Sequence, residues 1–219
     1  MNIYLVVEGP VGEKQVYSHW VPLVNPKLSV VKTINDVKKD NIIIYSGGGY
    51  PSYFEVIEAG IEDVASTPHL DRLVIAIDSE EMTYDDKRKE IEDFISDTGT
   101  TIDYKIIIQH FCLETWALGN KKIVSRKPKD KKLQEYNQHF NVLVNDPELL
   151  PDYPQDGLNR AQFAEHYLRK LLNEKHRNLT YTKSNPSALL HDKYYDNVKN
   201  RLNNDGHNKS FNDFLLAFI

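Results

Sequence analysis

The sequence predicts an α/β fold, with a mostly parallel, Rossmann-like sheet flanked by helices and a C-terminal helical extension. Short apolar runs alternate with helical patterns up to residue 120, which is typical of strand–helix–strand units. After residue 120 the helical patterns continue and no strand pattern appears. Hydrophobic residues make up 40% of the 219 residues and charged residues 27%, which is enough apolar material for a packed core.

The elements of the first domain, residues 1–120, follow from apolar spacing and turn signals. β-branched or apolar runs predict strands at 3–7, 29–34, 41–46, 71–78 and 103–111. Helical stretches are expected at about 12–20, ending near Pro22, and at 52–65 and 83–98, and the last strand runs into LETWALGN. Three glycines, Gly47 to Gly49, follow the third strand without the Lys-Ser/Thr of a P-loop, so we interpret them mainly as a tight turn.

The second part, residues 121–219, is expected to be a basic loop followed by helices that pack on the first domain. The segment 121–132 carries seven basic residues and one acid, and 146–157 is rich in proline. Apolar residues at helical spacing predict helices at 160–176, within 185–204 and at 210–219.

Several classes of protein are disfavoured by composition. No apolar run approaches the length of a transmembrane helix, so no membrane partner is expected. The first ten residues lack the basic flank of a signal peptide. Cys112 is the single cysteine, which excludes an intramolecular disulfide and a cysteine-cluster metal site. A reducing, cytoplasmic location is therefore expected.

Charge is distributed unevenly along the chain. Residues 1–120 hold 10 Lys/Arg and 20 Asp/Glu, a net charge of −10, whereas residues 121–219 hold 17 and 12, a net charge of +5. One interpretation is that the acidic part holds cations while the basic part faces a polyanion. The other is that the two parts simply have differently solvated surfaces.

Two predicted strands end in carboxylates. Glu8 follows the first strand, and Asp78 ends the strand 71–78, with Glu80 just after it. Ligands of open parallel sheets bind beyond the carboxyl ends of the strands, and clustered carboxylates need a cation. Oxygen ligands suit Mg²⁺ or Mn²⁺ and phosphate substrates. The alternative is that these acids cap the helices that follow.

Glu114 lies in an unusually apolar segment. In a helical arrangement, FCLETWALG is apolar almost all round, and a carboxylate there is costly without a partner. A metal ion, a lysine or an arginine could supply that partner. A partly exposed glutamate at a helix start is the other interpretation.

Together these residues resemble the TOPRIM domain. The resemblance rests on Glu8-Gly9 after a first strand and on Asp78-Ser79-Glu80 after a later one. FCLETWAL, YTKSNPSAL and the final SFNDFLLAF resemble small stand-alone TOPRIM proteins that accompany ABC- or OLD-type ATPases in phage-defence systems. This similarity covers most of the chain, although its motifs are short.

The resemblance implies a nuclease site. Glu8 would act as acid/base or metal ligand, Asp78 and Glu80 as the metal pair, and Glu114 would complete the site. Glu13 would be a candidate for a second metal, although it lies one step from the commonest family spacing, and the family's usual pair is Asp-x-Asp.

The basic segment could hold a DNA or RNA backbone, or it could be a solvated loop. Its candidate nucleic-acid-binding residues are Lys121, Lys122, Arg126, Lys127 and Lys129.

Two functions follow from the resemblance. The first is a Mg²⁺- or Mn²⁺-dependent nuclease that hydrolyses phosphodiesters as an effector of antiviral defence. The second is a non-catalytic TOPRIM-like subunit that senses nucleic acid or a phage protein in complex with an ABC-type ATPase. A homo-oligomer is compatible with either function.

Overall fold

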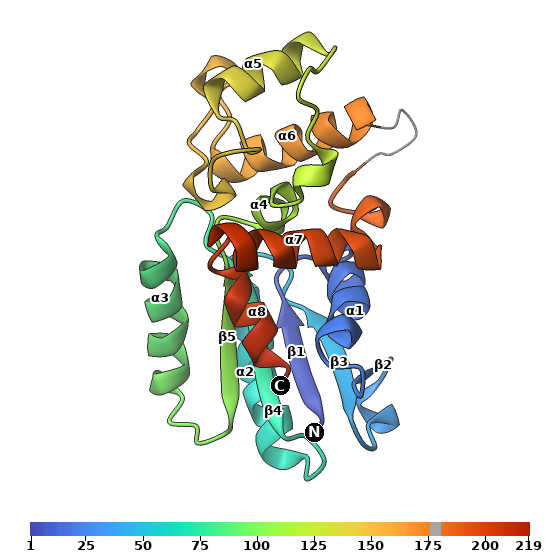
Figure 1. The fold of residues 1–219 in the computed structure, drawn as a ribbon. Coiled ribbons are helices and arrows are strands. Elements are labelled where there is room, and N and C mark those ends of the chain that lie inside the picture. The colour runs from blue at the N-terminus through green and yellow to red at the C-terminus, as the bar shows by residue number, and fades with distance from the viewer. Residues whose placement is uncertain (176–180) are drawn as a thin grey trace. The chain divides into compact units, whose positions relative to one another are not determined.

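A five-stranded parallel sheet forms the centre of the first part of the chain (Figure 1). The computed structural model describes residues 1–175 and 181–219. The strands lie in the order β2-β3-β1-β4-β5, and Leu5 of β1 pairs with Ile44 of β3 and Val74 of β4. Their bounds are β1 (Ile3–Val7), β2 (Ser29–Val31), β3 (Asn41–Ser46), β4 (Arg72–Asp78) and β5 (Tyr104–Gln109).

Hydrogen bonds establish that β4 and β5 also run parallel. The Leu73 N–H donates to the Asp103 carbonyl at 3.0 Å, and six residues later the Ser79 N–H donates to the Gln109 carbonyl at 3.1 Å. Donor and acceptor positions advance together, which only parallel strands allow. The predicted α/β class with a parallel sheet is confirmed.

The chain forms two compact units whose boundaries differ from the predicted division at residue 120. Unit 1 comprises residues 1–77, 84–108 and 213–219. Unit 2 comprises residues 78–83 and 109–212. The last seven residues therefore belong with the first domain, because Phe214 packs edge-on against Tyr17 and Trp20.

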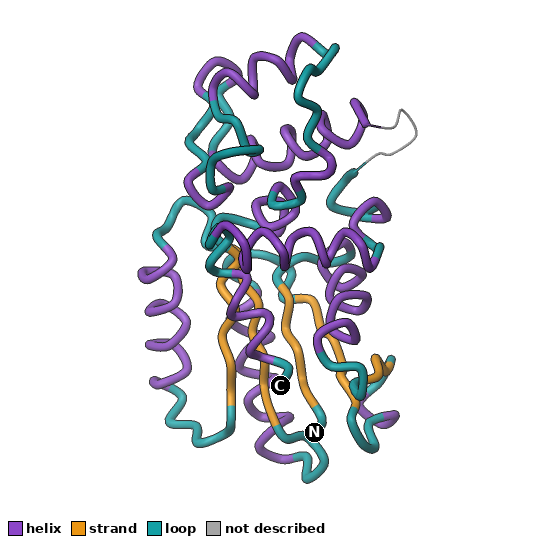
Figure 2. The backbone as a smooth tube through the Cα atoms, in the orientation of Figure 1, coloured by secondary structure: helices purple, strands orange, loops and turns teal. Residues whose placement is uncertain are grey.

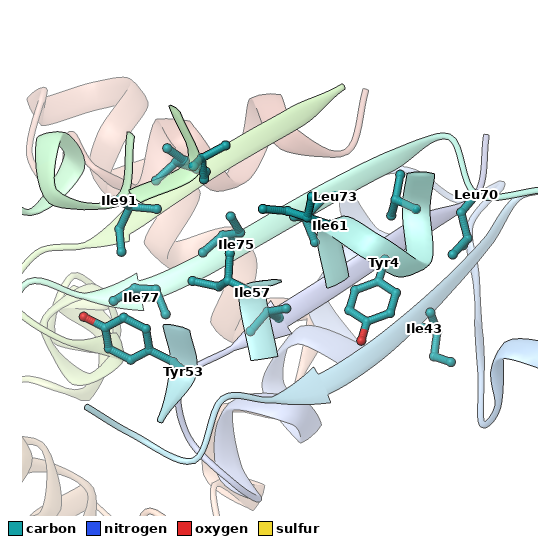
Figure 3. Packing of buried hydrophobic residues seen from close by; sticks show 14 of the residues in the cluster. Tyr4, Ile43, Tyr53, Ile57, Ile61, Leu70, Leu73, Ile75, Ile77 and Ile91 are labelled. Atoms are coloured by element: carbon teal, nitrogen blue, oxygen red, sulfur yellow. The ribbon is translucent and has the colours of Figure 1, made fainter. Parts of the chain in front are cut away.

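Unit 1 has one apolar layer on each face of its sheet. Tyr4, Val6 and Ile75 point from the strands to one face, where they meet Ile57 of α2 (Tyr53–Ser66) and Ile91 of α3 (Tyr84–Asp97) (Figure 3). The alternate positions face α1 (Gly12–Val24) and α8 (Phe211–Ala217) (Figure 1). This two-sided burial explains why the strands appear as continuous apolar runs.

Helix α1 continues beyond its predicted end. Proline was expected to stop it near residue 22, yet it runs through Pro22 to Val24 and closes with the Asn25 N–H on the Val21 carbonyl at 2.9 Å. Trp20 and Val21 are buried just before the proline, and their packing holds the last turn in place despite the missing N–H.

The predicted turn after β3 is present, with φ of +77° at Gly48 and +83° at Gly49.

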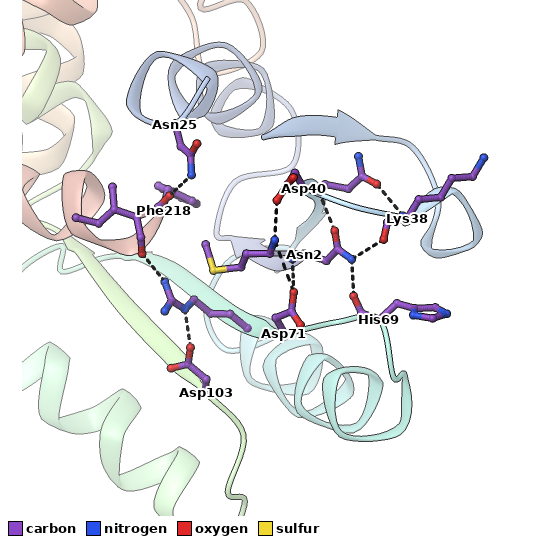
Figure 4. A network of polar contacts seen from close by, with 12 residues as sticks. Asn2, Asn25, Lys38, Asp40, His69, Asp71, Asp103 and Phe218 are labelled. Atoms are coloured by element: carbon purple, nitrogen blue, oxygen red, sulfur yellow. Dashed lines mark hydrogen bonds and ion pairs between the residues drawn. The ribbon is translucent and has the colours of Figure 1, made fainter. Parts of the chain in front are cut away.

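The amino-terminal edge of the sheet is held by polar contacts (Figure 4). The Asn2 side chain donates to the carbonyls of His69 at 2.6 Å and Lys38 at 3.1 Å and accepts from the Asn41 N–H at 2.9 Å. The terminal ammonium forms an ion pair with Asp40 at 2.7 Å. These bonds join loops that precede three different strands.

Unit 2 consists mainly of helices and loops (Figure 2). The helices that lie wholly within it are α4 (Leu113–Leu118), α5 (Lys131–His139), α6 (Arg160–Lys175) and α7 (Asp192–Asp205). Helix α5 was not predicted; it begins at Asp130, whose side chain accepts from the Leu133 N–H at 2.9 Å. Residue 176 of the predicted helix lies outside the described residues.

Aromatic rings fill much of unit 2. The rings of Tyr136, Phe163 and Tyr167 contact one another, with centroids 5.0 to 5.5 Å apart, and Tyr153 packs against Tyr136 and Phe163.

Within the described residues, no helix has the length and apolar character needed to cross a membrane.

Candidate functional site

Asp78 ends β4 and is buried together with its neighbour on β5. Its side chain is 9% exposed, and its Oδ1 accepts a hydrogen bond at 3.0 Å from Nε2 of the fully buried Gln109. The carbonyl oxygen of the Gln109 amide is buried and has no hydrogen-bond partner among the described residues. A carboxylate and an orphaned amide oxygen thus lie together where the two strands end.

Glu114 provides a second buried carboxylate in unit 2. It lies in α4, is 2% exposed, and accepts a hydrogen bond at 2.7 Å from the Tyr181 hydroxyl. The interpretation as a partly exposed glutamate is therefore wrong, because the whole of α4 is buried. The tyrosine stabilises a charge that would otherwise be costly in this setting.

Lys183 brings a positive charge to both carboxylates. Partial burial lowers the pKa of its ammonium, but Glu114 and Asp78 outweigh that effect and hold the pKa above its usual value. The residue itself is exposed to solvent. The lysine is therefore protonated at neutral pH, and its charge is shared by two acids.

Cys112 lies within the same electrostatic field. Burial, reinforced by the negative charges of Glu114 and Asp78, raises the pKa of its thiol well above the usual value. A protonated, buried thiol is neither a nucleophile nor a soft metal ligand.

Glu80 occupies a different environment from Asp78. It is exposed, its φ is +49°, and its N–H donates to the Phe111 carbonyl at 2.9 Å. Between the two acids, Ser79 is fully buried and its hydroxyl lies 2.7 Å from Nδ1 of His110. Burial, with Arg160 nearby, lowers the pKa of His110 to about 4, so its ring is neutral at neutral pH.

Two predicted site residues lie in unit 1. Glu8 directly follows β1 and is 9% exposed; its N–H donates to the Ala76 carbonyl at 3.1 Å, two residues before Asp78 in the sequence. Glu13, on the first turn of α1, accepts a hydrogen bond from the Gly9 N–H at 3.0 Å. Its carboxylate thus closes the turn between β1 and α1.

The acids do not form a complete metal cage on their own. Among residues 1–175 and 181–219, no three His, Cys, Asp or Glu side chains are grouped so as to hold a metal ion. Mg²⁺, however, is usually held by one or two carboxylates, with waters and substrate phosphates completing its octahedron. Asp78 and the free Gln109 oxygen are ligands of the right chemistry for such an open site.

The predicted basic residues divide into two groups. Lys121 forms an ion pair with Asp205, and the Lys129 N–H donates to Glu174 at 2.7 Å. Lys122, Arg126 and Lys127 are exposed. The segment is therefore partly folded, since a 3₁₀ turn spans Lys121–Ile123, and partly a solvent-facing loop.

Gln109, Tyr181 and Lys183 were not predicted as site residues. Gln109 is a polar residue at the end of an apolar strand, which is the same signal that identified Asp78. Tyr181 and Lys183 fall in YTKSNPSAL, a segment noticed only for its family resemblance. Their separation of 67 residues or more from Glu114 hides the contact from any local pattern.

No protein-family model, curated protein or solved structure matches this chain in the comparisons made.

Proposed function

We propose that this protein is a divalent-metal-dependent nuclease that hydrolyses phosphodiesters of DNA or RNA. One observation carries the proposal: buried Asp78 lies beside an unpartnered amide oxygen where two parallel strands end. That edge is where open parallel sheets bind ligands, and these are the oxygen donors that Mg²⁺ or Mn²⁺ prefers. The TOPRIM resemblance and a role in antiviral defence belong to the same proposal.

Asp78 and Gln109 would hold the cation, with Glu80 as a further ligand, and Glu8 of unit 1 stays a predicted ligand. When bound, the cation supplies charge that stabilises the phosphodiester as negative charge develops on it. Glu13 remains a proposed ligand of a second cation, although its carboxylate is already engaged by Gly9.

The remaining groups would position and neutralise the substrate. Tyr181 fixes the orientation of the Glu114 carboxylate through its 2.7 Å hydrogen bond. Lys183 is exposed, and the negative charges of Glu114 and Asp78 raise the pKa of its ammonium, so it can present a positive charge to a phosphate. Its raised pKa rules it out as a general base at neutral pH.

A second candidate function is favoured by the same lysine. Lys183 already supplies a positive charge to both acids, so they are neutralised in part without a metal. On that basis the chain would be a non-catalytic subunit that binds nucleic acid or a phage protein and works with an ABC-type ATPase.

Nuclease assays with metal titrations separate the two functions. Purified chain is incubated with single- and double-stranded DNA and RNA in Mg²⁺, Mn²⁺ or a chelator, and Mn²⁺ binding is followed by calorimetry with and without an oligonucleotide. The nuclease proposal expects cleavage that the chelator abolishes and that Asp78→Asn reduces at least about a hundredfold.

Asp85→Asn is the matched control, because Asp85 is an exposed acid on the first turn of α3. It should cleave and bind Mn²⁺ like the wild type. Cleavage that persists in the chelator, or an Asp78→Asn variant as active as the control, would refute the nuclease. An inactive wild type that binds strands without Mn²⁺ would favour the second function.

A further inference from the structure

Unit 2 contains a polar cavity that the proposed catalytic residues do not use. Its volume is about 220 Å³, and it lies between α7 and the 3₁₀ turn that follows α4. Asn197, Asn200 and Asn204 line it at spacings of three and four residues, which places their side chains along one face of the helix. Lys121 and Lys122 line it from the turn.

Two charged residues that line this cavity, Arg201 and Asp205, are held by contacts within unit 2. The buried Arg201 guanidinium donates to the carbonyls of Val142 at 3.0 Å, Leu143 at 3.1 Å and Asn145 at 2.6 Å. Asp205 accepts ion pairs from Lys121 and from Nε of Arg201, the latter at 3.3 Å. The single acid of the cavity is thus neutralised by two cations, and both walls are held in place.

The groups that remain are three side-chain amides and one cation. Within the described part of the chain, the amides of Asn197, Asn200 and Asn204 make no side-chain hydrogen bond, and the Lys122 ammonium joins no ion pair. Each amide offers two N–H donors and a carbonyl acceptor, and the ammonium offers three donors. With Asp205 neutralised, the cavity presents a net positive charge to solvent.

We propose that this cavity binds one sugar–phosphate unit of a nucleic-acid strand. The amide N–H groups and Lys122 suit phosphate oxygens, and the amide carbonyls suit sugar hydroxyls. Pockets for drug-sized ligands run from roughly 300 to 1,000 Å³, so this cavity accepts one such unit rather than a longer segment. The inference rests on the proposed function for its class of ligand, and it adds a strand-holding site to that function.

The test is strand binding measured in a chelator, so that cleavage plays no part. Fluorescence anisotropy with labelled single-stranded RNA and DNA gives Kd at several salt concentrations for the full chain. Asn200→Ala with Asn204→Ala should raise Kd about tenfold, because donors to a charged group are lost. Lys122→Gln should raise Kd and reduce the slope of log K against log salt by about one.

Matched controls lie on the same helix. Asn203 and Lys193 are exposed residues of α7 that do not line the cavity. Asn203→Ala and Lys193→Gln should keep Kd within about twofold and the salt slope within the error of the measurement. All variants should keep the wild-type melting temperature, since exposed helical asparagine is readily replaced by alanine.

Two outcomes overturn the inference: cavity variants that bind strands like the wild type, or controls that lose as much affinity as the cavity variants. If the cavity variants lose binding but the wild type shows no metal-dependent cleavage, the nuclease proposal fails and this inference stands. If the wild type cleaves strands but the cavity variants bind them like the wild type, this inference fails and the nuclease proposal stands.

Discussion

The two units are stabilised by different kinds of contact. In unit 1, isoleucine and valine from four strands pack against α2 and α3, and polar groups are bonded at the amino-terminal edge of the sheet and around Lys87 and Arg88 of α3. In unit 2, charged and polar side chains lie inside the fold: Glu114 is 2% exposed and Arg201 is also 2% exposed. Unit 2 therefore depends on specific bonds between distant residues.

This difference has energetic and functional consequences. An apolar layer tolerates small changes of shape. Removing one member of a buried polar pair, by contrast, leaves the other member buried without a hydrogen-bond partner. The predicted site residues Asp78, Glu80 and Glu114 and the cavity beside α7 belong to unit 2, whereas Glu8 and Glu13 belong to unit 1. Mutations in unit 2 should accordingly show larger and more pH-dependent effects than conservative changes in unit 1.

Replacing Arg201 tests the comparison most severely. Arg201→Leu removes the donors to three carbonyls and leaves Asp205 without its buried partner. We expect the free energy of unfolding to fall by about 3–5 kcal/mol. Urea unfolding measures the loss, and hydrogen exchange should locate it in unit 2.

Ile75→Val is the unit 1 counterpart, because Ile75 is fully buried in the sheet core. Its expected cost is about 0.5–1.5 kcal/mol. If Arg201→Leu cost no more than Ile75→Val, the contrast between the units would not hold.

The pH dependence of stability provides the second test. Glu148 accepts hydrogen bonds from the N–H and hydroxyl of Ser210, and Ser210 accepts from Trp116 Nε1 at 2.7 Å. Burial raises the pKa of Glu148 from 4.5 to about 7. A raised pKa means that the folded state favours the protonated acid, so its contribution is complete below pH 4.5 and is lost as pH rises through 7.

By linkage, this shift of the pKa corresponds to a loss of about 3 kcal/mol in the free energy of unfolding. Unfolding free energies from pH 4 to 8 should fall more steeply for the wild type than for Glu148→Gln. The variant is needed because His110, with its pKa lowered to about 4, acts with the opposite sign and loses stability as pH falls. Parallel pH profiles for the two proteins would contradict the prediction.

The smallest effect expected for unit 2 is at the Tyr181–Glu114 bond. Tyr181→Phe removes the hydroxyl that donates to Glu114 at 2.7 Å, and we expect a loss of about 2 kcal/mol. Tyr50→Phe in unit 1 should change stability little, because Tyr50 is 65% exposed. A double-mutant cycle with Glu114→Gln should show strong coupling, and additive effects would mean that the bond contributes nothing.

The sequence predicted the sheet of unit 1 closely. Strands 3–7 and 41–46 were predicted at their observed bounds because apolar side chains on both faces leave a continuous signal. It also predicted that Glu114 needs a partner, since an apolar helix cannot hold a free carboxylate. The partner's identity was left open among a metal, a lysine and an arginine.

Errors arose where distant contacts override local signals. Helix α1 passes Pro22 because Trp20 and Val21 are held by packing, and α5 forms within a stretch whose charge suggested a loop. The final residues join unit 1 because Phe214 meets Tyr17, nearly 200 residues away along the chain. None of these outcomes is encoded in a window of neighbouring residues.

By itself, then, the sequence determined which segments become strands and helices and which acids end the strands, because periodicity and burial are local properties of a chain. Only the tertiary structure decided that Gln109 accompanies Asp78, that Tyr181 donates to Glu114, and that three asparagines line a cavity. Hydrogen bonds and charges act through space over a few ångströms, and the residues they join can lie anywhere in the chain.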